Sequence, residues 1–327
     1  MLNYFIRRLG YMLVTLVIIA VLGFVIIELP PGSYVETEVR RLQRMGGNLG
    51  DDQVKALYRR YGLDQPEYVR FWKWITGFVR GDFGEAFAYN MPVSDLLWAR
   101  LGFTVVISLL TLIFSWVVAI FIGIYSATHQ YTIPDYLITV LQFTGLAVPN
   151  FMLALVLMVF AQRFFNIEVG GLYSQQFEGA PFSLAKLMDL LKHLWIPIIV
   201  IGASGTAWLS RVTRANMLDV LNMQYVQTAR SKGLSENVVV WKHAFRNALH
   251  PLIMVLGGSL PGIISGETIV AIVLNLPTTG PLYFNALLNK DMYLAGTFLM
   301  FLSIMLLLGN LGADMLLAWV DPRIRYE

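Results

Sequence analysis

The sequence has no cysteine among its 327 residues. That absence excludes disulfides, thiolate metal sites, iron–sulfur clusters and cysteine nucleophiles. Charge is also scarce. Charged residues make up 14% of the chain and hydrophobic residues 57%, whereas a soluble domain carries roughly 25% charge. The net charge of +3 is too small to indicate nucleic acid as a partner. These shortages argue against a soluble globular protein.

Sequence motifs for enzymatic chemistry are missing as well. The chain has no GxxxxGK[ST] loop to hold the phosphates of ATP and no GxSxG nucleophile turn. Its four histidines form no HExxH set. His243 and His250 share an expected helical face, which leaves a metal pair open, but histidines of an interfacial basic loop are the simpler interpretation. We therefore predict no catalytic residue, no bound cofactor and no metal site in this chain.

The chain is instead rich in long uncharged stretches. A helix needs about 20 apolar residues to cross the hydrocarbon core of a membrane. Six stretches reach or approach that length, and among them only the fifth contains a charged residue, Glu267: residues 9–27, 101–134, 136–162, 194–210, 251–276 and 292–313. The sequence thus predicts an all-α integral membrane protein with six transmembrane helices.

The orientation follows from basic residues outside these stretches. Residues 211–250 hold six basic and two acidic residues, and Arg7 and Arg8 precede the first stretch. Since short basic segments stay in the cytoplasm, both termini and this loop are predicted to be cytoplasmic. The first stretch is longer than a signal-peptide core and is followed by Pro30 and Pro31 rather than by a cleavage site, so we expect a retained anchor.

This topology divides the chain into three parts. Residues 1–29 form an N-terminal anchor helix, residues 30–100 a small extracytoplasmic segment, and residues 101–327 the membrane core, with the basic loop at 211–250. In the extracytoplasmic segment, apolar residues recur at helical spacing up to Gly62 and again up to Gly81. They predict a packed helical layer. A lip that contacts substrate is the alternative.

The basic loop is predicted to form two helices joined by a glycine turn. One face of the first helix is expected to carry Leu218, Leu221, Tyr225 and Ala229. Gly233 then suits a left-handed turn, and Ser235 with Glu236 suits the start of a second helix. An apolar stripe beside a basic rim needs a partner, which is either the bilayer surface or another protein.

Polar and helix-breaking residues inside the stretches are candidates for function. An ionisable residue at membrane depth indicates function by default, although a glutamate hydrogen-bonded at a helix break is the simpler interpretation of Glu267. Pro149 and Pro261 are expected to interrupt helices at membrane depth. Such breaks are tolerated where the backbone lines a cavity or meets neighbouring helices.

Ordered sequence blocks resemble a known family. The run YVQTARSKGLS at 225–235 is similar to the EAA signature of permease subunits of binding-protein-dependent ABC importers, and HAFRNALHP at 243–251 resembles its continuation in the dipeptide/oligopeptide/nickel branch. Further blocks agree with that branch in order and spacing: FIRRL at 5–9, YGLDQP at 61–66, GDFG at 81–84, LPTTGPL at 276–282 and DPRIR at 321–325. The long segment at 30–100 resembles the first of the two permease types that such importers pair. Two departures are Gln227, where the general signature has glutamate, and the order of Gly280 and Pro281.

The resemblance implies a multi-pass permease subunit of an ATP-driven importer in a bacterial or archaeal plasma (inner) membrane, for peptides or oligosaccharides delivered by an extracytoplasmic binding protein. The implied partners are a second, similar permease and two cytoplasmic ATPase subunits, which would bind ATP and Mg. The residues implied to contact the ATPase are Tyr225, Gln227, Thr228, Ala229, Arg230, Lys232, Gly233, Leu234 and Ser235. The candidates for the translocation path are Glu267, Pro149, Asn150, Ser259 and Pro261.

Two other classes of membrane protein are alternatives to an importer permease. A secondary transporter or channel, not coupled to an ATPase, usually shows more intramembrane charge or an inverted repeat of its helices. A membrane-embedded enzyme would need a nucleophile, a metal set or a carboxylate pair at bilayer depth. The sequence displays none of these features, which favours the permease.

Overall fold

The computed structural model describes residues 2–47, 50–165, 170–181, 183–265 and 267–320, and their side chains except those of 2–5, 257–265, 313 and 316–320. The described chain is mostly helical and separates into two compact units. Unit 1 comprises Met1–Gly102 and Thr279–Leu307, and unit 2 comprises Phe103–Thr278 and Leu308–Arg325. Two long helices, α5 (Val93–Thr128) and α14 (Met292–Val320), run from one unit into the other.

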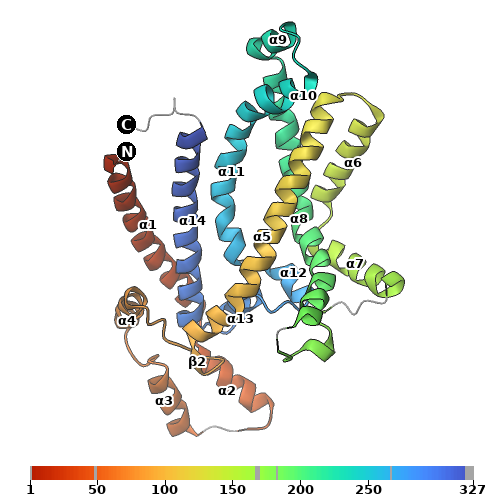
Figure 1. Cartoon of the computed structure of the whole chain (residues 1–327). Helices are drawn as coiled ribbons and strands as arrows, with labels where there is room; N and C mark the ends of the chain where they lie inside the picture. Colours follow the sequence, from red (N-terminus) through yellow and green to blue (C-terminus); the bar gives the residue numbers. More distant parts are fainter. Residues whose placement is uncertain (1, 48–49, 166–169, 182, 266, 321–327) are drawn as a thin grey trace. The chain divides into compact units, whose positions relative to one another are not determined.

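Unit 1 is built on α1 (Leu2–Glu28), which lies beside the first half of α14 (Figure 1). The two helices approach closely, since a Cβ added to Gly23 would clash with the Leu299 side chain. The helix α1 ends where Pro30 and Pro31 follow, because proline has no N–H to continue the hydrogen-bond ladder. The predicted helix over this stretch is thus present.

The segment after α1 folds into a packed layer, as predicted. It consists of α2 (Tyr34–Arg44), α3 (Asp51–Arg60), α4 (Glu67–Arg80) and a two-stranded antiparallel hairpin of β1 (Glu85–Ala86) and β2 (Met91–Pro92). The helix α13 (Thr279–Leu288) belongs to the same unit. Four side chains form a core between these elements: Tyr34, Val35, Tyr61 and Phe87. Gly62 and Gly81 both have positive φ, which stops α3 and α4 where the sequence predicted.

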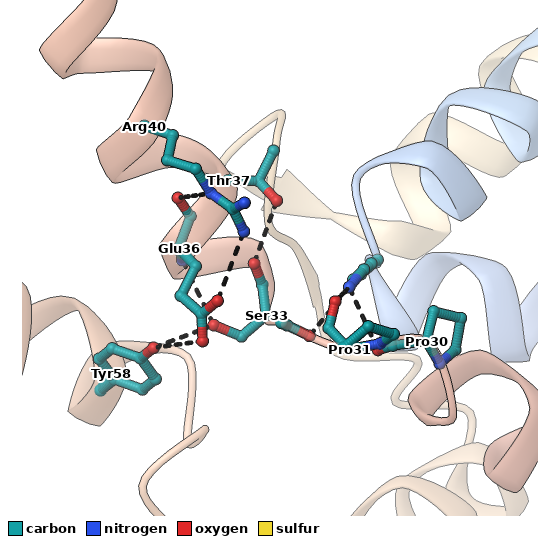
Figure 2. Close-up of polar contacts among 9 residues, drawn as sticks. Pro30, Pro31, Ser33, Glu36, Thr37, Arg40 and Tyr58 are labelled. Carbon is teal, nitrogen blue, oxygen red and sulfur yellow. Dashed lines mark hydrogen bonds and ion pairs between the residues drawn. The ribbon is translucent and has the colours of Figure 1, made fainter.

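Polar contacts hold the start of this layer in place (Figure 2). The Ser33 hydroxyl accepts a hydrogen bond of 3.3 Å from the backbone N–H of Glu36 and so caps α2, and it lies 3.1 Å from the Tyr58 hydroxyl of α3. The Lys290 ammonium donates to the carbonyl oxygens of Pro30, Pro31 and Gly32. Lys290 therefore binds the carbonyl groups of the turn after α1. These carbonyls have no helical N–H partner, because proline ends the hydrogen-bond ladder.

Unit 2 is a helical bundle. It contains most of α5, then α6 (Ile133–Ala147), α7 (Asn150–Phe165), a short 3₁₀ turn η1 (Gln175–Phe177), α8 (Leu184–Leu221), α9 (Gln224–Ser231), α10 (Glu236–Val238), a π-helical turn η2 (Val239–Ala244), α11 (Phe245–Ser265) and α12 (Thr268–Val273). The largest core cluster joins α7, α8 and α12 through Ala154, Ala161, Ile196, Val200 and Val270. Small residues on α7 allow this close packing.

Three helices of the described chain are long and apolar enough to cross a membrane: Ile6–Glu28, Val93–Thr128 and Met292–Gly312. The pair α6 and α7 would make a fourth crossing, bent by 106° at the break between Ala147 and Asn150. The expected break at Pro149 is therefore confirmed within the stretch at 136–162. Proline has no N–H for the ladder, and the residue before it avoids the helical conformation.

The expected break at Pro261 is wrong. The helix α11 continues through that position to Ser265, and the interruption lies further along, where Glu267 precedes α12. In the same way, α8 continues through Pro197. A membrane helix tolerates an internal proline when neighbouring helices compensate for the lost hydrogen bond.

Candidate coupling region and intramembrane polar site

The region from α9 to η2 lies at one end of unit 2, between the end of α8 and the start of α11 (Figure 1). Val226 and Ala229 of α9 are buried, with 0% and 5% of their surface exposed. They pack against a cluster from α5, α8, η2 and α11: Ile124, Met217, Leu221, Val239, Val240, Ala244 and Ala248. The apolar face of α9 is therefore covered by the chain itself.

This packing corrects the predicted stripe of Leu218, Leu221, Tyr225 and Ala229. The helix α8 ends at Leu221, so Tyr225 belongs to a separate helix and is exposed, while its neighbour Val226 is buried. Sequence reasoning missed Val226, although its spacing of three from Ala229 marks the buried face of a short helix. Residues 222–223 separate α8 from α9 and interrupt the helical period. A different set of residues on α9 therefore faces the bundle.

The outer face of this region is exposed. Seven of the nine residues implied to contact an ATPase are exposed there: Tyr225, Gln227, Thr228, Lys232, Gly233, Leu234 and Ser235. Of the other two, Ala229 is buried and Arg230 is half-buried. Leu234 leaves 41% of its surface exposed on this polar turn.

A left-handed glycine and an ion pair shape the turn after α9. Gly233 has φ +74°, as predicted, and its N–H donates to the Arg230 carbonyl oxygen over 2.9 Å. The Arg230 guanidinium then spans the turn to the Glu236 carboxylate of α10, with N–O distances of 2.6 and 3.2 Å. This contact lowers the pKa of Glu236. Ser235 occupies the N-cap position and Glu236 begins the helix, as predicted, but the Ser235 side chain makes no capping hydrogen bond.

Further contacts join α9 to its neighbours on both sides. The Asn247 amide of α11 donates to the Tyr225 hydroxyl over 2.7 Å, and the Gln227 amide donates to the Leu221 carbonyl oxygen over 3.2 Å. Trp241 of η2 lies 5.5 Å from the Phe121 ring of α5, measured between ring centroids. The region is thus held to α5, α8 and α11 at once.

Two of the predicted path residues meet at a second site in unit 2. The Asn150 amide, at the start of α7, lies 2.8 Å from both carboxylate oxygens of Glu267 and 3.1 Å from the Ser204 hydroxyl of α8. Pro149 occupies the bend directly before Asn150. The site therefore connects the two helix breaks, α6/α7 and α11/α12. The side chains of Ser259 and Pro261 lie outside the described part of the chain.

Two more polar contacts connect α6 with α8, and the sequence reasoning missed both. The Gln142 amide donates to the Ser210 hydroxyl over 2.9 Å. Nearer the start of α6, the buried Asp135 carboxylate accepts from the Arg214 guanidinium at 2.9 and 3.1 Å and from Ser126. Positions 135, 142 and 150 thus contact positions 214, 210 and 204 in order. The spacing of seven residues between Asp135 and Gln142 along α6 is the signal that could have found these two contacts, whereas Asn150 lies on α7, beyond the bend.

A cavity of about 240 Å³ opens between α5, α8 and α11. Its lining is apolar except for three hydroxyl residues of α5: Ser108, Thr111 and Ser115. Gly205 lines this cavity. Gly202 instead packs against Ser115, because a Cβ added to Gly202 would lie 2.8 Å from the Ser115 hydroxyl oxygen. Gly202 therefore packs tightly against α5, whereas a Cβ added to Gly205 would meet nothing within 4 Å. Within the residues searched, no three metal-ligating side chains gather at one place.

Comparison with known proteins covers the whole chain. Residues 119–326 match the family model described as the binding-protein-dependent transport system inner membrane component, and residues 1–110 match the N-terminal model of such membrane components. The chain is 35% identical to the oligopeptide transport system permease protein AppB of Bacillus subtilis over 325 residues, 99% of each chain. It is 34% identical to the glutathione transport system permease protein GsiC of Salmonella paratyphi A and 33% identical to that of Escherichia coli K12, over the full length of each.

The match extends over both units and agrees with the membrane-length helices. The chain therefore belongs to the family of inner-membrane components of binding-protein-dependent transport systems, as a multi-pass permease subunit of an ABC importer that works with separate ATPase and substrate-binding proteins.

Proposed function

We propose that this chain forms half of the translocation path of an ATP-driven peptide importer, with α9 and the Gly233 turn as its contact to an ATPase subunit. The observation that supports this assignment is the two-sided construction of α9. Its inner face is buried on the bundle through Val226 and Ala229, while its outer face is exposed. A force applied to the outer face of such an element would be transmitted directly to α8 and α11.

The proposed topology has six crossings, formed by α1, α5, the bent pair α6 and α7, α8, α11 and α14. Both termini and the loop at 211–250 would then lie in the cytoplasm, and residues 30–100 outside it. The division into residues 1–29, 30–100 and 101–327 follows from this topology. The six basic residues of the loop support the orientation, since positive charge stays on the cytoplasmic side.

The proposed assembly contains a second, similar permease, two cytoplasmic ATPase subunits and an extracytoplasmic binding protein. ATP and Mg would bind to the ATPases and no cofactor to this chain. Peptides are proposed as cargo because the relatives are named for oligopeptide and glutathione transport.

The proposed route of coupling runs from α9 along α8 to the Asn150 site. Closure of the ATPases would displace α9 and with it the end of α8. The contacts Asp135–Arg214 and Gln142–Ser210 would make α6 follow α8. The movement would then reach the break at Pro149, where Asn150 binds Glu267. A two-state element at one end would thus alter a site at the other.

Photo-crosslinking tests this assignment. A crosslinking amino acid at Leu234 should capture an ATPase subunit in the assembled importer, because that side chain is exposed on the outer face of the turn. The matched control is Met45, which is exposed by 75% but lies in the segment assigned to the opposite side. A correctly assembled importer without crosslinks from Leu234 would contradict the coupling assignment. Capture of an ATPase from Met45 would contradict the topology.

A further inference from the structure

The helix α4 presents three different faces. Its inner face packs on α1 and the start of α14 through Arg70, Phe71, Trp74 and Phe78. Trp74 is 1% exposed, and a Cβ added to Gly296 of α14 would lie 2.9 Å from its ring. The Arg70 guanidinium donates to both carboxylate oxygens of Glu28 at 2.8 and 3.0 Å. The helix is therefore fixed to two helices of membrane-crossing length.

The second face of α4 is aromatic and apolar, yet exposed. Tyr68, Trp72 and Val79 leave 69%, 63% and 81% of their surfaces open. Their spacing of four and seven residues places them on one side of the helix. A helix outside the membrane would carry these side chains in water, where their apolar surface is unfavourable.

The third face of α4 is polar and basic. Lys73 and Arg80, seven residues apart, share one side of the helix, with Thr76 between them, and all three are exposed. This side adjoins the aromatic face, about a quarter-turn further round the helix axis. One helix thus combines a protein-packed face, an exposed aromatic face and an exposed basic face.

The axis of α4 has a different direction from the axes of α1 and α14. Figure 1 shows it nearly end-on beside α1 and α14, so its axis crosses theirs instead of running along them. Its contacts reach Glu28, at the end of α1, and the first turns of α14. Those two helices are long and apolar enough to cross a membrane, and the family is one of inner-membrane components. A helix lying across their ends is therefore at the level of the membrane interface.

We propose that α4 is an interfacial helix whose exposed faces bind phospholipid. Tyr68, Trp72 and Val79 enter the boundary between headgroups and acyl chains, where amphipathic aromatic rings are favoured. Lys73 and Arg80 bind lipid phosphate groups. The outer leaflet is the one concerned if the topology proposed above holds, but the lipid contact itself does not depend on the orientation. The Arg70–Glu28 contact then joins this lipid-bound helix to α1.

The absence of cysteine makes the lipid contact directly measurable. Single cysteines at Trp72 and Val79 would carry nitroxide labels in the complete importer, reconstituted in bilayers that contain phosphatidylglycerol. Both labels should collide more with oxygen, which dissolves in the bilayer, than with a water-soluble nickel complex. A label at Met45, exposed on the same unit, should show the opposite preference. Nickel accessibility at 72 and 79 equal to that at 45 overturns the proposal. Protection of 72 and 79 only after the binding protein is added also overturns it, in favour of a protein-docking face.

Charge reversal tests the phosphate contacts separately. The double variant K73E/R80E should retain fewer phosphatidylglycerol molecules after purification, by a factor of about five per lost basic residue in lipid affinity. The matched control is K55E/R59E on α3, where both residues are also exposed basic side chains. Its lipid retention should equal that of the wild type. An equal loss in both variants, or no loss in either, contradicts specific binding by Lys73 and Arg80.

Discussion

Asp291 is a fully buried carboxylate in a tight turn of unit 1. Its oxygens accept hydrogen bonds from the backbone N–H groups of Leu294, at 3.1 Å, and of Phe87, at 2.6 Å. It thereby caps α14 and fixes the hairpin segment to it. Burial nevertheless dominates over these hydrogen bonds and raises the pKa of Asp291 to about 6.

This raised pKa predicts a pH dependence of stability. The folded chain takes up the proton near pH 6, whereas an unfolded aspartate does so near pH ~4. The free energy of unfolding should therefore rise as pH falls from about 6 to about 4, by about 3 kcal/mol, and stay level above pH ~6. Thermal unfolding of the purified chain at about pH 5 and about pH 7.5 measures this. In the D291N variant the contribution of residue 291 to the pH dependence of the free energy of unfolding should be absent. An identical pH profile in both proteins would contradict it.

The Asn150–Glu267 contact makes a second prediction about single residues. Replacing either side chain by alanine should reduce transport roughly tenfold, because each leaves a polar partner without its hydrogen bond. The double variant N150A/E267A should be little worse than either single variant, since residues in direct contact are not additive. Transport of a labelled peptide by the reconstituted importer measures this. Strictly multiplicative losses would contradict the energetic connection of the two helix breaks. The exposed Gln175, changed to alanine, serves as control.

The helix breaks show which features of the helices could be predicted from the sequence and which could not. Gly233 and Pro149 were predicted correctly because each acts through its own backbone, by positive φ in one case and by a missing N–H in the other. Pro261 was predicted wrongly because a helix tolerates an internal proline where its surroundings compensate for the lost hydrogen bond, and the local sequence does not show whether they do. The burial of Val226 was missed for the same reason, since only the tertiary structure shows where α8 ends.

The Gly233 turn makes a prediction at the scale of an element. The variant G233P should reduce transport at least tenfold and abolish the stimulation of ATP hydrolysis by substrate, because proline is restricted to φ near −65° and cannot adopt +74°. Insertion into the membrane should stay normal, since the turn is exposed and an added Cβ at position 233 meets nothing within 4 Å. Vesicle transport and ATPase assays, with membrane fractionation, measure the two effects.

A matched substitution separates backbone shape from other effects at this turn. Asparagine tolerates positive φ far better than other side chains, so G233N should retain most of the transport that G233P loses. If G233P transports at the wild-type rate, the turn does not transmit the movement. If G233N fails as completely as G233P, the side chain and not the backbone conformation is responsible.

At the scale of the whole molecule, the sequence predicted the class of protein better than its geometry. Low charge and uncharged stretches identify a membrane protein, because these depend only on the apolar solvent. The ordered blocks, from 5–9 to 321–325, led to the family that the comparisons establish. The series of contacts between α6 and α8 was not predicted. Those contacts join residues 68 and 79 positions apart in the chain, Gln142 with Ser210 and Asp135 with Arg214. Beyond the bend at Pro149, Asn150 of α7 continues the series with Ser204 of α8.

The last prediction concerns the division of labour in the assembly. The purified chain should hydrolyse no ATP, because the sequence has no GxxxxGK[ST] loop and the family is the membrane component of its transport systems. Adding the ATPase subunits should restore hydrolysis, and peptide transport should require the binding protein as well. The G233P variant supplies the control, since it should assemble with the ATPases yet leave hydrolysis unresponsive to substrate. ATP turnover by a preparation free of ATPase subunits would contradict the division. Peptide uptake that needs no ATP would instead favour a secondary transporter, because only a path whose Asn150 site opens independently of α9 could work without the ATPases.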